Sequence, residues 1–600
     1  MSVKLRFEPE GRRAHCGPGE SLLASARRAG VRIASTCGGR GTCKSCAVRI
    51  IEGTPPEASP ADHEFFSDHE LAAGWRRACQ SFPAADCAVL VPARSHAAPL
   101  RTEVAGEDIA VAPDPAVRGY KLALDPPDAS DPRADGERLV AGLNAKWPGL
   151  CHGVDGVVLR GLPGVLRAND WRVLAAVRFG EVVAVLPQKS PLVGLAVDLG
   201  TTNIGVFLVD LRTGKTLASR GVENPQTVHG GDLISRAGFA RRNPDGGKVL
   251  RDLARGAINR AAADLCAERG LTPEAIADIV VAGNMVMHHS LLGLPLDHLC
   301  AAPFVPVQRD ALDLKARDCG LTAAPGACVH LLANIAGFIG GDHVAMLLAI
   351  DAEAQTGRVL ALDIGTNTEV SLLHDGAISS VSCPSGPALE GGAISAGMRA
   401  AAGAIESVRI EGDEVTLKTL EDAPPAGLCG SGVLDAVAAL YGAGVLDARG
   451  RFAGSHPRQS GRLAGAAFHL SDSAPPVTFT QADVRAVQLA KSAIRAGIAV
   501  LLARAGLAVA DLDRIIIAGA FGNYIHLPGA IAIGLLPDAP LGRFVQVGNA
   551  AGVGARLALV SYPHRAEGRA IAARSQAVDL AGAPDFMPAF MKHMNFPRKE

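Results

Sequence analysis

Apolar and polar residues alternate over residues 3–7, as they do in a strand that buries one face. A second short strand is expected at 13–16. An apolar run at 22–29 follows Gly19-Glu20-Ser21, which predicts a helix with Ser21 as its N-cap. A loop rich in glycine and cysteine comes next, and then another strand pattern. Residues 1–92 are therefore expected to form one small domain, with that loop at 36–46 and that strand at 47–51.

The next two stretches differ from each other in pattern. Residues 93–116 are rich in proline, alanine and small polar residues without periodicity, which indicates a linker. Residues 117–191 predict a small α+β middle domain without obvious chemistry. Its expected elements are a strand at 120–124, a helix at 131–147 and two strands at 172–178 and 181–186 joined by Phe179-Gly180.

An internal repeat occurs after residue 192, where glycine-rich turns separate β-branched strands from alanine-rich helices. The segment LAVDLGTTN at 195–203 is echoed by LALDIGTNT at 360–368. The segment DIVVAGNMVMHHS at 278–290 is echoed, in the same order, by RIIIAGAFGNYIH at 514–526. Residues 192–600 are therefore expected to form two related α/β halves with a ligand cleft between them.

Composition and charge narrow the function classes. The 600 residues are 48% hydrophobic and 20% charged, which is typical of globular proteins and excludes a long disordered chain. The net charge of −1 argues against general nucleic-acid binding. The apolar run nearest to a membrane span, 498–510, contains Arg504, and the first residues lack the apolar core of a signal peptide. We expect a cytoplasmic protein without a nucleic-acid or membrane partner.

The cysteines suggest metal chemistry. There are 13 in the chain, and six fall in the first ninety residues. Four of these six follow the spacing C-x5-C-x2-C…C, and four thiolates hold either zinc or an iron–sulfur cluster. Gly38, Gly39 and Gly41 favour a [2Fe–2S] cluster, because glycine lets the backbone wrap closely around the sulfides. Zinc is the alternative, although zinc ribbons usually show two CxxC knuckles and this spacing has one.

With its predicted strands and helix, this region resembles a β-grasp [2Fe–2S] ferredoxin of the vertebrate and adrenodoxin-like type, which has five residues in the first gap. The resemblance implies four cluster ligands: Cys37, Cys43, Cys46 and Cys79. The assignment of Cys79 as the fourth ligand rests on its distance along the chain and on the ferredoxin-like context Ala78-Cys79-Gln80. Cys16 and Cys87 lie outside the spacing and are expected to be small buried hydrophobes.

Two Asp-x-Gly-Thr turns, on matching halves of the repeat, carry the second candidate chemistry. Glycine lets backbone amides and threonine hydroxyls approach phosphate oxygens, and the aspartate can hold Mg²⁺ directly or through water. The pair resembles the duplicated RNase H-like fold of actin, Hsp70 and hexokinase (ASKHA), in which two such loops face each other across a nucleotide. The resemblance implies ATP-binding residues in both turns: Asp198, Gly200, Thr201, Thr202 and Asn203, and Asp363, Gly365, Thr366 and Asn367.

Further turns match this fold less specifically. Its adenosine motif, an apolar strand that ends in a glycine-rich turn, is matched by Gly519, Ala520 and Gly522. Gly430 and Ser431 precede a predicted helix, where they either supply amides near the nucleotide or form a packing turn. The turn Gly548-Asn549-Ala550, after another strand, leaves the same two alternatives open. Glu390 is either a Mg²⁺- or water-orienting group or a solvated carboxylate. The nearby Met/His cluster is expected to be core and surface rather than a metal site: Met285, Met287, His288 and His289.

The whole chain resembles the reductive activators of corrinoid proteins. The resemblance follows the order of the domains and includes five specific stretches, at 224–236, 282–294, 334–342, 385–400 and 594–597. It implies that the protein uses ATP to reduce the inactive Co(II) corrinoid of a methyltransferase system to Co(I). The implied cofactors are a [2Fe–2S] cluster, ATP and Mg²⁺, and a reductase or ferredoxin would supply the electrons. The implied catalytic residues are Asp198, Asp363 and Glu390.

Two other functions remain open at this point. One is an activator of the 2-hydroxyacyl-CoA dehydratase kind, but such proteins hold a [4Fe–4S] cluster within the ASKHA domain, and no matching cysteines are present. The other is a non-catalytic, actin-like nucleotide-sensing module with the ferredoxin as a docking handle. A sugar kinase is a weaker variant, because nothing identifies a sugar pocket. The oligomeric state stays open between a monomer and a homodimer.

Overall fold

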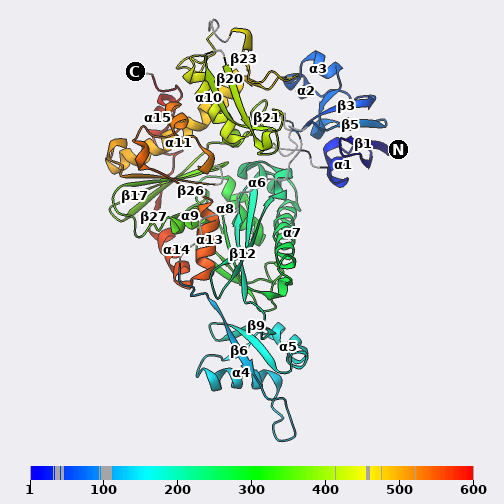
Figure 1. Ribbon diagram of the computed structural model, residues 1–600, viewed down its shortest axis with the longest axis vertical. Helices are drawn as coiled ribbons and strands as arrows, with labels where there is room; N and C mark the ends of the chain where they lie inside the picture. Colours follow the sequence, from blue (N-terminus) through cyan, green and yellow to red (C-terminus); the bar gives the residue numbers. More distant parts are fainter. Residues whose placement is uncertain are drawn as a thin grey trace.

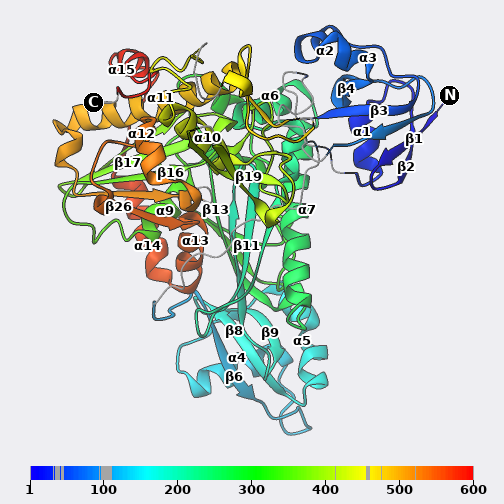
Figure 2. The ribbon, with the colours of Figure 1, turned by 45° about the horizontal axis from the view of Figure 1, so that its top comes forward.

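The computed structural model has three parts, which separate clearly in two views (Figures 1 and 2). A small N-terminal domain lies against one side of a large α/β body, and a second small domain hangs from the opposite end of that body. Each part has its own hydrophobic core. The structure describes residues 2–31, 33, 41, 46–92, 95, 111–412, 414–453, 460–474, 476–519 and 522–598.

The N-terminal domain is a five-stranded mixed sheet with a helix across it, the arrangement expected for a β-grasp ferredoxin. Its sheet order is β2-β1-β5-β3-β4, with β1 antiparallel to β2 and parallel to β5. The helix buries Leu22, Leu23 and Ala26, and Ser21 caps it by accepting the amide hydrogen of Ala24, as predicted. The elements are β1 Val3–Glu8, β2 Arg12–Cys16, α1 Leu22–Arg28, β3 Ala47–Gly53, α2 Pro60–Phe65, α3 Asp68–Ala72, β4 Trp75–Arg77 and β5 Cys87–Leu90.

The second small domain is a four-stranded sheet, in the order β6-β8-β9-β7, covered by two helices. Its elements are β6 Val117–Ala123, α4 Asp135–Lys146, β7 Gly153–Val154, α5 Gly156–Ala168, β8 Arg172–Arg178 and β9 Glu181–Pro187. Phe179 and Gly180 both have positive φ, so they form the predicted tight turn between β8 and β9. Residue Asp114, just before this domain, hydrogen-bonds to Val560 and Tyr562 of the large body through its backbone.

Two helix predictions in this domain were incomplete. The helix predicted from residue 131 begins at Asp135. Asp131 lies in the turn before it, where its carboxylate binds Arg133 of the same turn and Arg138 of the helix. Helix α5 was not predicted, since its glycines and its proline are poor helix formers. It forms because Asp155 caps its first turn and Val158, Leu162 and Leu166 face the core.

The large body contains two six-stranded sheets with the same central topology. Their orders are β12-β11-β10-β13-β15-β14 and β26-β25-β16-β17-β18-β27. The equivalent strands β10 and β16 are each antiparallel to the next strand in the chain and parallel to β13 or β25. The register is also equivalent, since Asp198 lies opposite Ala282 and Asp363 lies opposite Ala518. The predicted repeat and the ASKHA-like fold are therefore confirmed.

The first half of this body runs from β10 to α9. Its elements are β10 Val193–Leu199, β11 Asn203–Asp210, β12 Thr216–Glu223, α6 Leu233–Arg242, α7 Gly246–Ala267, β13 Ile276–Gly283, α8 Met285–Leu292, β14 Leu312–Lys315, β15 Cys328–Leu331 and α9 Gly341–Ala349. Helix α8 is buried along nearly its whole length, so its methionines and histidines all lie in the core and none lies at the surface.

The second half carries an additional three-stranded sheet, in the order β20-β19-β21, beside α10. Its first elements are β16 Val359–Ile364, β17 Thr368–His374, β18 Ala377–Cys383, β19 Ala404–Glu411, β20 Glu414–Thr419, β21 Gly427–Leu428, α10 Gly430–Gly442, β22 Leu463–Ala464, β23 Ala467–His469 and β24 Thr478–Thr480. The remaining elements are α11 Gln481–Ala505, β25 Arg514–Ala518, α12 Leu527–Ala532, β26 Phe544–Gly548, α13 Ala550–Val560, α14 Tyr562–Arg574, β27 Ser575–Ala577 and α15 Phe586–Lys592.

Helix α11 is a core element of the second half. Among the described residues it is the one helix long and apolar enough to cross a membrane, but 72% of its most apolar window is buried inside the protein. Val487, Ile494 and Ile498 belong to the hydrophobic core of the second half. The helix ends at Gly506, which adopts the left-handed conformation typical of a helix C-terminus.

Candidate nucleotide cleft and cluster site

A cleft of about 820 Å³ lies between the two halves, where the Asp-x-Gly-Thr turns end β10 and β16. This volume is in the range of small-molecule sites. Most residues predicted for the nucleotide line it: Asp198, Gly200, Thr201, Thr202, Asn203, Asp363, Gly365, Thr366, Asn367, Glu390, Gly430, Ser431 and Gly519. Gly522 is not among the lining residues, since it packs beneath the turn at Gly519. Ala520 lies outside the described residues.

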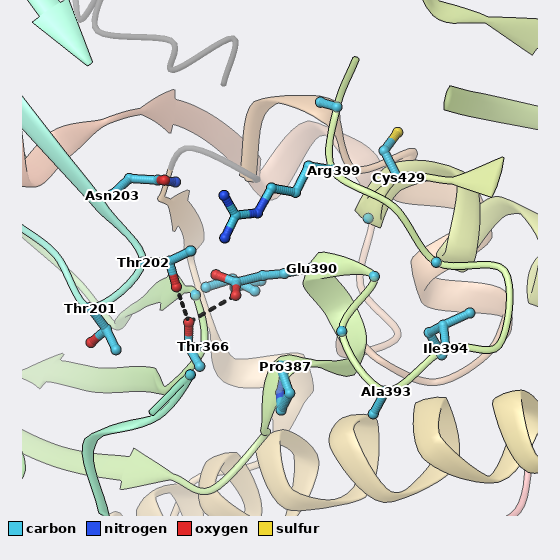
Figure 3. A pocket seen from close by; sticks show the side chains of 18 of the residues that line it. Thr201, Thr202, Asn203, Thr366, Pro387, Glu390, Ala393, Ile394, Arg399 and Cys429 are labelled. Atoms are coloured by element: carbon cyan, nitrogen blue, oxygen red, sulfur yellow. Dashed lines mark hydrogen bonds between the residues drawn. The ribbon is translucent and has the colours of Figure 1, made fainter. Parts of the chain in front are cut away.

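The two turns touch each other through their threonines (Figure 3). The hydroxyl oxygens of Thr202 and Thr366 are 3.1 Å apart, and Thr366 donates its proton to Oε2 of Glu390 at 2.8 Å. Thr202 must therefore be the donor to Thr366. The amide of Asn284 donates to the hydroxyl of Thr201 at 3.0 Å. The hydroxyls of Thr202 and Thr366, one from each turn, thus meet at one point of the cleft. The oxygens of a phosphate group could accept hydrogen bonds from hydroxyls placed there.

Four carboxylates gather at the bottom of the cleft: Asp198, Asp342, Asp363 and Glu369. Desolvation and, to a smaller extent, repulsion from Asp342 raise the pKa of Asp363 to about 8 and that of Asp198 to about 7. Desolvation also raises the pKa of Asp342 to about 6 and that of Glu369 well above its usual value. The raised pKa values mean that the four groups are not all ionised in the metal-free protein, and a bound cation would stabilise their ionised forms by offsetting the repulsion between them.

The donor set fits a magnesium ion that is shared with a ligand. Within the described parts of the chain, no three His, Cys, Asp or Glu side chains lie close enough together to hold a metal ion. Mg²⁺ usually binds one or two carboxylates and takes its other ligands from phosphate oxygens and water. The carboxylates of Asp198 and Asp363 would hold it in that way, and the ion would neutralise charge on the phosphates.

Several lining residues, Asp342, Glu369 and Arg399 among them, were not predicted from the sequence, and Asn549 belongs to a turn for which the sequence left packing and contact open. Asp342 lies in the first turn of α9, and Asn549 caps α13 and hydrogen-bonds to Asp198. These two helices pack against each other, and both begin at the cleft, where their N-termini favour anions. The available signal was a glycine-rich turn before each helix, at Gly340-Gly341 and Gly548. Glu369 and Arg399 carry no comparable signal.

The structure describes two of the four predicted cluster ligands, and their sulfur atoms lie next to each other. The sulfurs of Cys46 and Cys79 are 3.3 Å apart, and both residues are buried. Two thiolates on one tetrahedral metal, each about 2.3 Å from it, lie about 3.8 Å apart, so a small shift would place both on one iron. The pairing of β3 with β4 brings the two cysteines together, because Cys46 directly precedes β3 and Cys79 closely follows β4. Ala78 donates its amide hydrogen to the carbonyl of Cys46 and extends this pairing. Cys37 and Cys43 lie outside the described residues.

The surroundings of this pair also fit a cluster. Gly41 has φ +75°, and a Cβ there would lie 2.9 Å from the side chain of Gln80, so only glycine fits. Arg77 is completely buried, pairs with Asp62 at 2.9 Å and donates to the carbonyl of Gly41. Cys16 and Cys87 are buried elsewhere in the domain core, as predicted.

A first prediction concerns the threonine contact. Replacing Thr366 with valine keeps its volume but removes both side-chain hydrogen bonds, so that Glu390 loses its hydroxyl donor. We expect the affinity for Mg–AMP-PNP to fall about tenfold, in line with the loss of a hydrogen bond to a charged group. Titration calorimetry measures this loss, with Thr416→Val on the exposed face of β20 as the control. Equal affinities in the two variants would remove Thr366 from the phosphate site.

Four protein-family models match consecutive parts of the chain. They are a 2Fe-2S iron–sulfur cluster binding domain at 5–84, a RACo linker region at 106–190, a RACo middle region at 193–355 and the C-terminal, ASKHA domain of RACo at 358–600. The linker region of that family corresponds to the small domain of β6–β9, and the middle region corresponds to the first half of the large body.

Two individual proteins are similar over nearly the whole chain, and a third is similar over part of it. The corrinoid activation enzyme RamQ of Eubacterium limosum is 30% identical over 592 residues, 94% of each chain. A [Co(II) methylated amine-specific corrinoid protein] reductase of Methanosarcina barkeri is 26% identical over 388 residues, 59% of this chain and 68% of the relative. A solved structure of a reductive activator for a corrinoid, iron–sulfur protein covers all of this chain and 99% of its own, with 31% identity and a TM-score of 0.73.

Proposed function

The chain belongs to the family of reductive activators of corrinoid proteins, and we propose that it reduces the Co(II) form of a partner corrinoid protein to Co(I) at the expense of ATP. The observation that carries this proposal is the presence, in one chain, of a cysteine pair at metal-binding distance and a cleft with two phosphate-type turns. A [2Fe–2S] cluster supplies one electron at a time. The cobalt is the substrate, and it gains that electron while the cluster loses it.

The residues of the cleft have distinct proposed roles. The hydroxyls of Thr201, Thr202 and Thr366 bind the phosphates of ATP, together with amides of the two turns. Asp198 and Asp363 hold Mg²⁺. Glu390, which accepts the proton of Thr366, orients either that hydroxyl or a water molecule. Gly430, Ser431 and Gly519 line the same cleft and would face the rest of the nucleotide.

ATP is needed because the electron must move against a potential difference. For one electron, about 59 mV changes the equilibrium constant tenfold. Binding or hydrolysis of ATP can offset such a difference by stabilising a conformation of the complex in which the Co(II) centre is easier to reduce. A separate reductase or ferredoxin would return an electron to the cluster after each turnover.

The buried carboxylates predict a pH dependence of stability. Their raised pKa values mean that the folded, metal-free protein binds protons that the unfolded chain does not, so their stabilisation is complete in acid. It is lost progressively as the pH rises from the ordinary aspartate pKa of 3.8 to about 7 for Asp198 and about 8 for Asp363, so the last part of the loss falls between pH 7 and 8. We expect the Tm of the metal-free protein to fall by about 1–3 °C over this interval, and the increase in Tm given by Mg–ADP to grow. Scanning calorimetry measures both, and a constant Mg–ADP effect would contradict the carboxylate assignment.

The coupling of the nucleotide site to the partner can be tested through ATP hydrolysis. A corrinoid protein from the same cell, in its Co(II) form, is expected to accelerate hydrolysis several-fold. The same protein in its methyl-Co(III) form is the matched control and should have no such effect, since it needs no reduction. Equal rates with both forms would argue for an ATPase that does not recognise the inactive cobalt state.

A further inference from the structure

The described walls of the nucleotide cleft carry many carboxylates and a single basic side chain. Arg399 is the one lysine or arginine among the lining residues that the structure describes. Because the phosphates of a nucleotide are themselves negative, they need positive groups beside them in such a cleft. A bound Mg²⁺ is one such group, and Arg399 is the group that the chain itself supplies. The acidic lining residues are Glu64, Asp198, Asp342, Asp363, Glu369, Glu390, Glu406 and Asp483.

Arg399 lies where the two Asp-x-Gly-Thr turns meet. Its guanidinium extends into the cleft above the carboxylate of Glu390 (Figure 3). Glu390 accepts the proton of Thr366 at 2.8 Å, and the hydroxyl oxygen of Thr366 is 3.1 Å from that of Thr202. Desolvation raises the pKa of Glu390, and the positive charge of Arg399 opposes this shift. The only basic side chain on the described walls is therefore at the phosphate end of the cleft.

An ion pair holds this guanidinium from the opposite half of the body. Nη1 of Arg399, in the second half, lies 2.6 Å from Oε1 of Glu223, the last residue of β12 in the first half. The same oxygen accepts the hydroxyl proton of Thr227 at 3.3 Å, and Thr227 also lines the cleft. The approach of Nη1 to Glu223 lacks hydrogen-bond geometry, and this buried nitrogen makes no other hydrogen bond within the described parts of the chain. Arg399 thus retains donor capacity for a ligand.

The loop that carries Arg399 is fixed at two points before the arginine. The amide of Ser395 donates to Oδ1 of Asp483 in the first turn of α11, at 2.6 Å. The amide of Met398 donates to the carbonyl of Leu428 in β21, at 2.8 Å. The backbone next to Arg399 is therefore held in place without a ligand, which reduces the entropy that binding would cost.

We propose that Arg399 binds the phosphates of the nucleotide, by donating hydrogen bonds from its guanidinium to phosphate oxygens where the two turns meet, and that Glu223 positions it there. The inference rests on the proposed nucleotide site. The planar guanidinium carries several N–H donors in a fixed fork that matches the geometry of a phosphate group. Because Arg399 belongs to the second half and Thr202 to the first, a phosphate bound to both joins the two halves across the cleft.

Titration calorimetry of the full-length, cluster-loaded protein with Mg–AMP-PNP tests the phosphate contact. Arg399→Gln should bind about 10–100-fold more weakly, since hydrogen bonds between two charged groups are lost. Arg399→Lys should lose about 3–10-fold, because it keeps the charge but not the fork. Arg409→Gln is the matched control, since Arg409 is an exposed arginine of β19 that does not line the cleft, and it should stay within about twofold of the wild type. Cluster absorption and Tm verify that each variant is folded.

Glu223→Gln separates a phosphate contact from a merely structural ion pair. It removes the same ion pair as Arg399→Gln but leaves the guanidinium in the cleft, so its affinity should change by about threefold at most. Equal losses in Arg399→Gln and Glu223→Gln would overturn the phosphate contact, because Arg399 would then act only through Glu223. Wild-type affinity in Arg399→Gln would overturn it as well. If the wild type itself did not bind Mg–AMP-PNP, the proposed function would fail instead.

A second measurement needs no substitution. Phenylglyoxal modifies arginine side chains, and mass spectrometry of the digested protein follows Arg399 and Arg409 separately. Saturating Mg–AMP-PNP should slow the modification of Arg399 about tenfold, since a bound phosphate covers the guanidinium in most molecules. Arg409 should react at the same rate with and without the nucleotide. Equal rates for Arg399 in both conditions, in protein that binds Mg–AMP-PNP, would contradict the contact.

Discussion

Cys79→Ala is expected to lose the [2Fe–2S] absorption and to form no Co(I) above the level seen without the protein. The sulfur of Cys79 lies 3.3 Å from that of Cys46 in a buried site, and alanine offers no ligand in its place. Serine is a less decisive choice, because its oxygen can also bind metal. Anaerobic absorption spectroscopy measures the cluster and the Co(I) product in the same cuvette.

The matched control is Cys16→Ala in the same domain. Cys16 is completely buried and donates to the carbonyl of Glu20 at 3.3 Å, so its loss perturbs the core to a similar degree. It should keep the cluster and the activity. The Cys79→Ala variant should still bind Mg–AMP-PNP, because the phosphate turns lie in another domain. An intact cluster spectrum in Cys79→Ala would show that another residue is the fourth ligand.

Asp363→Asn is the second change with a large expected effect. It keeps the shape of the side chain but removes one of the carboxylates proposed for Mg²⁺. We expect ATP-dependent Co(I) formation to fall about 100-fold or more, a loss typical of removing a group that stabilises developing charge. The cluster spectrum should be unchanged, because Asp363 ends β16 in the large body. Stopped-flow absorption at saturating ATP measures the rate.

Asp375→Asn is the control for this variant, since its side chain is 85% exposed at the turn between β17 and β18. It should behave as the wild type. Full ATP-dependent activity in Asp363→Asn would remove this aspartate from the proposed site. Loss of the cluster spectrum in the same variant would instead indicate a folding defect, and the Tm would then reveal it.

The sequence predicted those features that depend on local pattern. The Asp-x-Gly-Thr repeat was visible because each turn directly follows a buried strand, and the equivalent register of Asp198 and Asp363 explains why the two copies meet. Ser21 and the Phe179-Gly180 turn were predictable for the same reason, since a cap and a tight turn are fixed by a few neighbouring residues.

Other features depend on contacts between distant segments. Arg399 reaches the cleft from a loop before β19, and its partner Glu223 ends β12 in the other half. Glu369 lies opposite Asp363 in the β16–β17 hairpin, whereas Asp342, in α9 of the first half, comes near Asp363 only when the two halves pack together. Gly522 illustrates the opposite case, since its motif suggests a nucleotide contact but it is not among the residues that line the cleft. Helix α5 needed tertiary packing to overcome its weak propensity.

The central claim is that one chain couples ATP to a one-electron reduction of cobalt on another protein. The most direct test mixes the anaerobically reduced protein with the Co(II) form of a corrinoid protein from the same cell and follows Co(I) absorption. The account predicts that Co(I) appears with Mg–ATP and does not appear without it. Co(I) formation that is equal with and without ATP would contradict the coupling, and its absence in both cases, with every corrinoid protein of the cell, would contradict the proposed reaction.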